Sequence, residues 1–156
     1  MTRVKPNYFF IPLFVIITAS AASYFAETGR SWYKTINLPD WTPSGSVMVL
    51  AWTIIFVLSS LSLLILWNKH SSEKNFGVII ALFILNALLI VGWNILFFSH
   101  QQIGLAFFQA MLLVANLILL IFLIWRLSPL ATYLLVPYSL YVLFSTVLTF
   151  NVWMIN

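Results

Sequence analysis

The chain has 156 residues, of which 63% are hydrophobic and 6% are charged, with a formal net charge of +4 and no cysteine. A soluble domain keeps its surface hydrated with about 25% charged residues, so this composition excludes an ordinary water-soluble protein. The missing cysteine excludes disulfides and thiolate chemistry, and the scattered Lys and Arg residues argue against nucleic acid as a partner.

Polar segments divide the chain into apolar runs, each close to the roughly 20 residues that a helix needs to cross a bilayer. We therefore expect an all-α membrane protein, with residues 1–156 forming a single bundle of five transmembrane helices. The spans are predicted at residues 8–25, 47–67, 76–98, 103–125 and 130–155. Residues 27–46 contain two glycines and two prolines, which predicts a long first loop with turns.

The first apolar run has an alternative interpretation as a cleaved signal peptide. Lys5 would belong to its basic start, and the small residues 19–22 would form its cleavage site. We favour a retained first helix because the rest of the chain is equally apolar. In the last span, Pro137 removes one backbone donor and predicts a kink.

Lys and Arg are distributed unevenly between the two sides of the membrane. The amino terminus and the second and fourth loops carry Arg3, Lys5, Lys69, Lys74 and Arg126, whereas the first loop carries Arg30 and Lys34. Because cytoplasmic loops are enriched in these residues, the pattern predicts a cytoplasmic amino terminus. The expected location is the cytoplasmic membrane of a bacterium.

Polar and aromatic side chains recur at helical spacing on one face of each later span, where polar groups should face the bundle interior. The faces are Trp52, Phe56 and Ser59; Asn86, Ile90, Trp93 and Phe97; Leu105, Gln109, Leu112 and Asn116; and Tyr138, Tyr141, Ser145 and Leu148. Such faces could line a pocket for a flat apolar ligand. Amides also hydrogen-bond between membrane helices, and spacing alone favours packing over a ligand site.

The sequence offers little for acid–base catalysis or metal binding. Its acids are Glu27, Asp40 and Glu73, none of them within a predicted span. His70 and His100 are predicted on opposite membrane faces, so they cannot share a metal ion. We expect no catalytic residue, metal or cofactor.

Several motifs, in order along the whole chain, resemble the tryptophan-rich sensory protein family, also called the translocator protein or peripheral benzodiazepine receptor family. They are Ser31-Trp32-Tyr33, Leu38-Pro39-Asp40-Trp41-Thr42-Pro43, Ala51-Trp52-Thr53, Trp93-Asn94-Ile95-Leu96-Phe97-Phe98, Gly104-Leu105-Ala106, Trp125-Arg126, Pro137-Tyr138 and Val152-Trp153-Met154-Ile155-Asn156.

The resemblance implies a dimeric membrane protein surrounded by lipid that binds porphyrin or haem, and in some lineages sterols or benzodiazepine-type ligands. The implied pocket lies beneath the first loop. From the family motifs it takes Tyr33, Pro39, Trp41, Pro43, Trp52, Trp93, Phe97, Leu105 and Leu148, and from the helical faces Phe56, Asn86, Ile90, Gln109, Tyr138, Tyr141 and Ser145. With the resemblance, the aromatic faces look more like a site than packing.

Some positions depart from the family pattern, above all Tyr141, where relatives usually carry tryptophan. Some relatives are said to degrade protoporphyrin photochemically through tryptophans at this position and at Trp52. Because this chain has Tyr141 in place of that tryptophan, the preferred function is a tetrapyrrole receptor active in transport or stress sensing. The alternatives are a light- and oxygen-dependent porphyrin-degrading enzyme and a structural or regulatory membrane component.

Overall fold

The computed structural model describes residues 5–156, and within these residues the chain is helical, with no strand. The long helices are α1 (Asn7–Thr28), α3 (Gly45–His70), α4 (Phe76–Asn94), α5 (Ile103–Trp125) and α6 (Pro129–Ile155). Two short elements are the helix α2 (Arg30–Tyr33) and the π-helical turn η1 (Ile95–Ser99), which continues α4. In the described part of the chain, five helices are long and apolar enough to cross a membrane, so the predicted all-α transmembrane bundle is confirmed.

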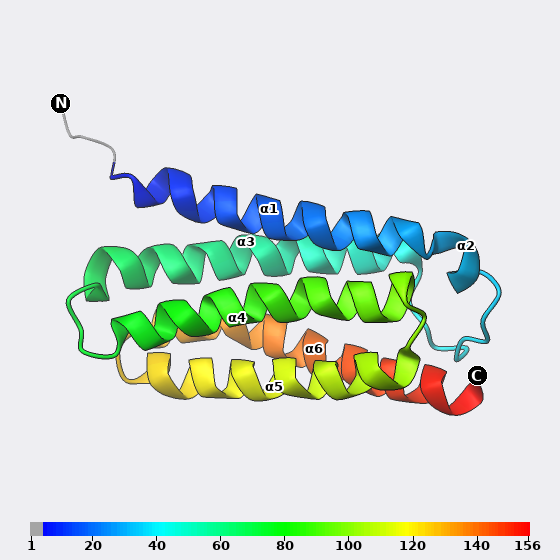
Figure 1. Ribbon diagram of the computed structural model, residues 1–156. Coiled ribbons are helices and arrows are strands. Elements are labelled where there is room, and N and C mark those ends of the chain that lie inside the picture. Colours follow the sequence, from blue (N-terminus) through cyan, green and yellow to red (C-terminus); the bar gives the residue numbers. More distant parts are fainter. Residues whose placement is uncertain (1–4) are drawn as a thin grey trace.

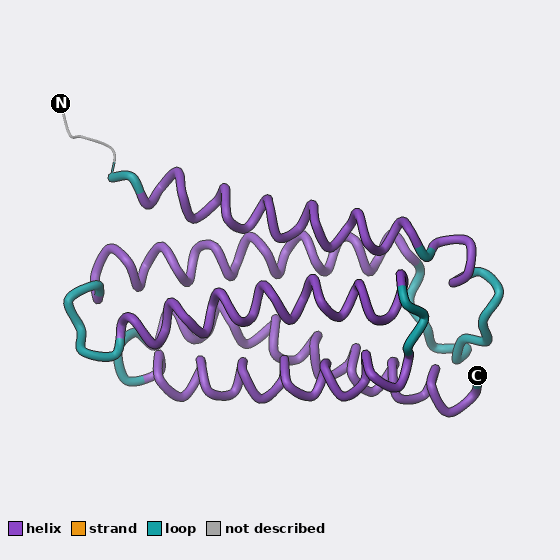
Figure 2. Tube along the Cα trace, viewed as in Figure 1, coloured by secondary structure: helices purple, strands orange, loops and turns teal. Residues whose placement is uncertain are grey.

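The long helices pack side by side in a closed ring. α1 contacts α3 and α4, α3 contacts α6, and α6 contacts α5, which returns to α4. Figure 1 shows that successive long helices run in opposite directions along the bundle, with the amino-terminal end of α1 and the carboxyl terminus at opposite ends. The connecting loops lie at the two ends (Figure 2). We call the end that carries α2, η1 and the carboxyl terminus the loop-one end.

The helix limits lie within three residues of the spans expected from the sequence. α6 begins where Pro129 occupies the first helical turn and the Ser128 hydroxyl accepts a hydrogen bond from the Ala131 backbone N–H at 3.3 Å. The main difference is in residues 27–46, where α1 continues to Thr28 and α2 forms a further helical turn. Pro137 lies inside α6 as expected. Arg3 lies outside the described residues.

The aliphatic core lies in the half of the bundle away from loop one. Its fully buried side chains include Leu66 near the end of α3, Ile79 near the start of α4, Ile124 at the end of α5 and Leu135 in the first half of α6. The Ser62 hydroxyl also donates to the Ala131 carbonyl at 2.8 Å, which joins α3 to α6. The large apolar side chains on the outer surface suit contact with lipid rather than water.

Loop one is fastened to the rest of the bundle at several points. The Asn37 N–H donates to Asn156 Oδ1 at 2.8 Å, and Asn156 Nδ2 donates to the Asn37 carbonyl at 2.9 Å. Where α1 meets α2, the backbone of Gly29 lies directly against that of Phe98 in η1, so a Cβ atom at Gly29 would collide with the Phe98 carbonyl. Loop one is thus held at its start and near its middle.

We predict that Gly29→Ala lowers the free energy of unfolding by about 1–3 kcal/mol, because the new methyl group must push apart two backbone segments. Thermal unfolding in detergent, followed by circular dichroism, measures the loss. Gly77→Ala is the matched control: space around Gly77 in α4 is open, and alanine is the better helix former. Equal unfolding midpoints for the two variants would contradict the close contact.

Candidate functional site

A continuous set of aromatic rings leads from loop one into the bundle interior. Trp41 in loop one packs edge-on against Phe144 at 5.6 Å between ring centroids, and Phe144 lies 5.9 Å from Tyr141. Tyr141 in turn contacts Trp52 edge-on at 5.7 Å, so rings from loop one, α3 and α6 meet here. Trp52 also contacts Phe56 and Tyr138 at 5.8 and 6.2 Å. We call these six residues the Trp52 cluster.

A second set of rings lies where η1 meets α2. Trp93 stacks on Phe97 at 4.8 Å with an angle of 13° between the ring planes. Trp32 and Tyr33 in α2 pack on the other edges of Phe97, at 5.6 and 6.2 Å, and leave it 3% exposed. Partial burial raises the pKa of the Tyr33 phenol, because the charged form is disfavoured away from water. With Phe98, these residues form the Phe97 cluster.

A chain of hydrogen bonds crosses the middle of the bundle. The Tyr138 hydroxyl donates to Asn86 Oδ1 at 2.6 Å, and Asn86 Nδ2 donates to Asn116 Oδ1 at 3.0 Å. Asn116 Nδ2 then donates to the Leu82 carbonyl at 3.3 Å. This series of hydrogen bonds connects α6, α4 and α5. Its first bond joins α6 to α4, which lie on opposite sides of the ring of helices. A buried phenol and two buried amides thereby provide hydrogen-bond partners for one another in a region without bulk water.

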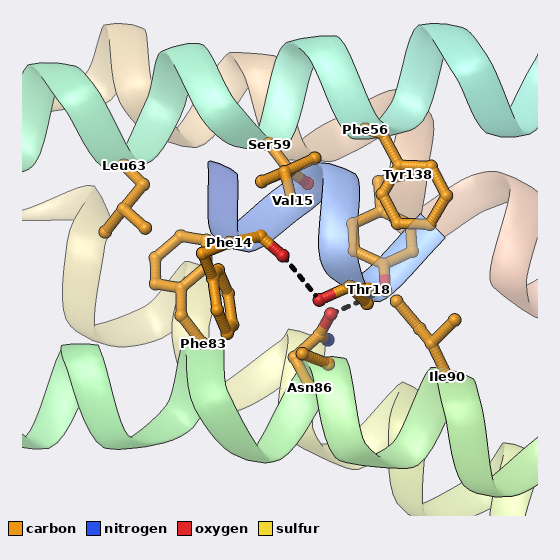
Figure 3. Close-up of a pocket in the computed structure, with 11 residues that line it drawn as sticks. Phe14, Val15, Thr18, Phe56, Ser59, Leu63, Phe83, Asn86, Ile90 and Tyr138 are labelled. Atoms are coloured by element: carbon orange, nitrogen blue, oxygen red, sulfur yellow. Dashed lines mark hydrogen bonds between the residues drawn. The ribbon is translucent and has the colours of Figure 1, made fainter. Parts of the chain in front are cut away.

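A small cavity lies beside Tyr138, between α1, α3 and α4 (Figure 3). Its volume is about 30 Å³, and its walls include four predicted site residues: Phe56, Asn86, Ile90 and Tyr138. Pockets for drug-sized ligands usually measure about 300–1,000 Å³. The site is therefore filled by its own side chains, and a ligand as large as a porphyrin would have to displace some of them.

The structure brings most of the predicted site residues together at the loop-one half of the bundle. The Trp52 cluster contains Trp41, Trp52, Phe56, Tyr138 and Tyr141, and the Phe97 cluster contains Tyr33, Trp93 and Phe97. Leu148 packs against the buried group of Phe97, Ala106 and Val152. Asn86 and Ile90 line the cavity, and the partly buried Pro39, Pro43 and Ser145 lie in loop one and on α6.

Two residues expected on the inner face of α5 lie elsewhere. Leu105 is 55% exposed and Leu112 is 61% exposed, so both point away from the bundle interior. The inner face of α5 is instead formed by residues that include Ala106, Ala110 and Leu113. The predicted helical phase was therefore wrong for these leucines, whereas Asn116 is buried as expected.

Gln109 has a role between helices. Its Nε2 atom donates to the Leu89 carbonyl at 3.0 Å, and its side chain rests on Gly92, where any Cβ atom would collide with it. Asn94, by contrast, donates to the Ile90 carbonyl within its own helix. The glycine opposite Gln109 makes room for a contact between α5 and α4 of the kind that holds membrane helices together.

The prediction of site residues missed contributions from α1 and from other aromatic residues. Phe14, Val15 and Thr18 of α1 line the cavity, and Trp32, Phe98 and Phe144 complete the two clusters. Thr18 could have been found as a polar residue near the middle of an apolar run. Within residues 5–156, the structure contains no group of three or more His, Asp or Glu residues suited to a metal ion.

Comparison with known proteins identifies relatives across bacteria and animals. The TspO/MBR family model matches residues 10–154. An uncharacterized membrane protein, YtaB, of Bacillus subtilis is 32% identical over 91% of this chain and 92% of its own length. The tryptophan-rich protein TspO of Bacillus cereus is 32% identical over 81% and 82% of the two chains. The translocator protein of Ovis aries is 26% identical over 85% and 79%.

We predict that Tyr138→Phe lowers the free energy of unfolding by about 0.6–1.5 kcal/mol, because Asn86 Oδ1 loses its donor. Tyr133→Phe on the same helix is the control, since the Tyr133 side chain is largely exposed and belongs to neither cluster. Thermal unfolding in detergent measures both variants. A loss as large in Tyr133→Phe would show that the Tyr138 hydrogen bond is not what the measurement reports.

Proposed function

The chain belongs to the TspO/MBR family. From this premise we propose that it binds tetrapyrroles such as protoporphyrin and haem within the membrane, and that this binding serves tetrapyrrole transport or stress sensing. Family membership supports a membrane binding or sensing role, and the tetrapyrrole ligand is our more specific proposal. We further propose a homodimer in a bacterial cytoplasmic membrane with a cytoplasmic amino terminus. The distribution of Lys and Arg between the two ends supports that orientation.

The observation that carries this proposal is the Trp52 cluster. Its rings form an unbroken series of contacts from the half-exposed Trp41 in loop one to the buried Tyr138 in the bundle interior. A tetrapyrrole is a wide, flat, conjugated ring. A bound tetrapyrrole can replace contacts between the rings of the cluster with contacts to its own ring. Each offset or edge-on aromatic pair contributes about 0.5–1.5 kcal/mol of stabilisation beyond burial.

The charges at the loop-one end suit the acidic side groups of a tetrapyrrole. Arg30 in α2 forms an ion pair with Glu27 at 3.1 Å, and both side chains are more than half exposed. Lys34 follows α2 and is exposed. Since an exposed ion pair contributes little to stability, Arg30 can exchange Glu27 for a ligand carboxylate at small cost.

A second candidate function is light- and oxygen-dependent degradation of the bound porphyrin. It is favoured by one contact, between the redox-active side chains of Trp52 and Tyr141 at 5.7 Å. If the protein degrades porphyrin, illumination in air should remove the Soret absorption faster than for free porphyrin in detergent, and Trp52→Phe should slow the loss. A loss at the rate of free porphyrin would eliminate this candidate.

We predict that protoporphyrin quenches the tryptophan fluorescence of the purified protein, and that Trp52→Phe weakens its binding about fivefold through the lost ring contacts. Trp125→Phe is the matched control, because Trp125 lies at the end of α5 away from loop one. Equal affinities of the two variants would place the ligand outside the Trp52 cluster. No quenching in the wild-type protein would remove the proposal.

Tyr141 provides a separate test of the position where relatives usually carry tryptophan. If the Tyr141 hydroxyl contacts the ligand, Tyr141→Phe should weaken protoporphyrin binding by the order of 1 kcal/mol, or about fivefold. If the hydroxyl serves only helix packing, the unfolding midpoint should fall while affinity is unchanged. Under the degradation hypothesis, Tyr141→Trp should accelerate the loss of porphyrin absorption. An absence of change in all three measurements would contradict every role proposed for Tyr141.

A further inference from the structure

The cavity of about 30 Å³ lies in the bundle interior, among side chains from α1, α3, α4 and α6. Most of its walls are apolar, including Phe14, Val15, Leu63 and Phe83. Three polar side chains from three different helices also line it: Thr18 of α1, Ser59 of α3 and Asn86 of α4. Figure 3 shows these side chains gathered around the same space, with the Tyr138 ring beside them.

Among the polar side chains that line this cavity, Ser59 has a polar atom without a hydrogen-bond partner. Its Oγ atom is inaccessible to solvent and has no hydrogen-bond partner among the described residues. The neighbouring polar groups are already engaged, since the Thr18 hydroxyl donates to the Phe14 carbonyl at 2.9 Å and Asn86 Oδ1 accepts from Tyr138. Both of these oxygens retain a free lone pair, because a hydroxyl or amide oxygen can accept two hydrogen bonds.

The cavity also lies where the side-chain hydrogen bonds between helices stop. Within the described part of the chain, α3 is joined to α6 by Ser62, and α4 is joined to α5 and α6 by Asn86, Asn116 and Gln109. The side-chain hydrogen bond between α1 and another element is that of Thr28 with Ser99, at the loop-one end. The middle of α1 therefore meets α3 and α4 at this cavity without a side-chain hydrogen bond between the helices.

We propose that this cavity is a binding site for a single water molecule that links α1, α3 and α4. The water accepts a hydrogen bond from the Ser59 hydroxyl and donates its two protons to Thr18 Oγ1 and Asn86 Oδ1. A buried water needs about 10–15 Å³ of such space and typically makes about three hydrogen bonds, and this cavity offers about 30 Å³ with Ser59, Thr18 and Asn86 in its wall. The water extends the Tyr138–Asn86–Asn116 chain to α1 and does not depend on the proposed tetrapyrrole ligand.

A crystal structure of the wild-type protein, at a resolution that shows ordered waters, tests the site directly. We expect density within hydrogen-bond distance of Ser59 Oγ and Thr18 Oγ1. A cavity without density would overturn the proposal, as would density for a bound lipid or detergent chain in that place. This measurement needs no variant and therefore does not depend on any substitution being tolerated.

The direction of a stability change provides the second test, using Ser59→Ala with the neighbouring Ser60→Ala as the control. Ser60 does not line the cavity. If Ser59 binds water, its loss should lower the unfolding midpoint relative to the control by about 2–4 °C, the shift expected for one ordinary hydrogen bond. If the Ser59 hydroxyl is instead buried without any partner, removing it relieves an unsatisfied polar group, and the midpoint should rise. A rise would overturn the proposal.

Discussion

The lipid bilayer imposes one constraint on which the rest of this structure depends: a polar group in the hydrocarbon must find its partner within the protein. The bundle meets this constraint at its centre with the hydrogen bond from Tyr138 to Asn86. That bond crosses the ring from α6 to α4, and Asn86 passes the connection to Asn116 of α5. Three helices are consequently fixed in register at mid-membrane, although their outer surfaces are apolar and offer no specificity of their own.

Above and below this central chain, the two halves of the bundle are built differently. The half away from loop one is filled by aliphatic side chains such as Leu66, Ile79 and Leu120, which pack closely and leave no exposed surface. The loop-one half is filled by rings that touch edge-on or stacked, and loop one, with the short helix α2, covers its end. Aliphatic packing and aromatic packing are thus separated along the bundle axis, with Tyr138 at the boundary.

The limits of the spans could be predicted because charged and polar residues interrupt the apolar runs where the helices leave the membrane. The phase of α5 could not be predicted equally well, because the lipid-facing Leu105 and Leu112 are as apolar as the inward-facing Leu113 and Leu117. In a membrane, small residues are the better indicator, and Ala106 and Ala110 do mark the contact face of α5. Thr18 stands out in the sequence as a polar residue in an apolar run, but the cavity beside it could not be predicted, since it arises from contacts between α1 and helices distant in sequence.

The filled interior determines how a large ligand can bind. Since the cavity measures only about 30 Å³, the proposed tetrapyrrole would gain ring contacts mainly by replacing contacts that the protein already makes with itself. The net binding energy is then the difference between two similar sets of contacts, less the cost of moving loop one. That cost includes the paired hydrogen bonds of Asn37 with Asn156, whereas the tight packing of Gly29 on Phe98 keeps the start of the loop in place. Trp41 lies in loop one beyond Asn37 and is the outermost ring of the Trp52 cluster, so a ligand entering from this end would have to displace Trp41 before it reached the other rings.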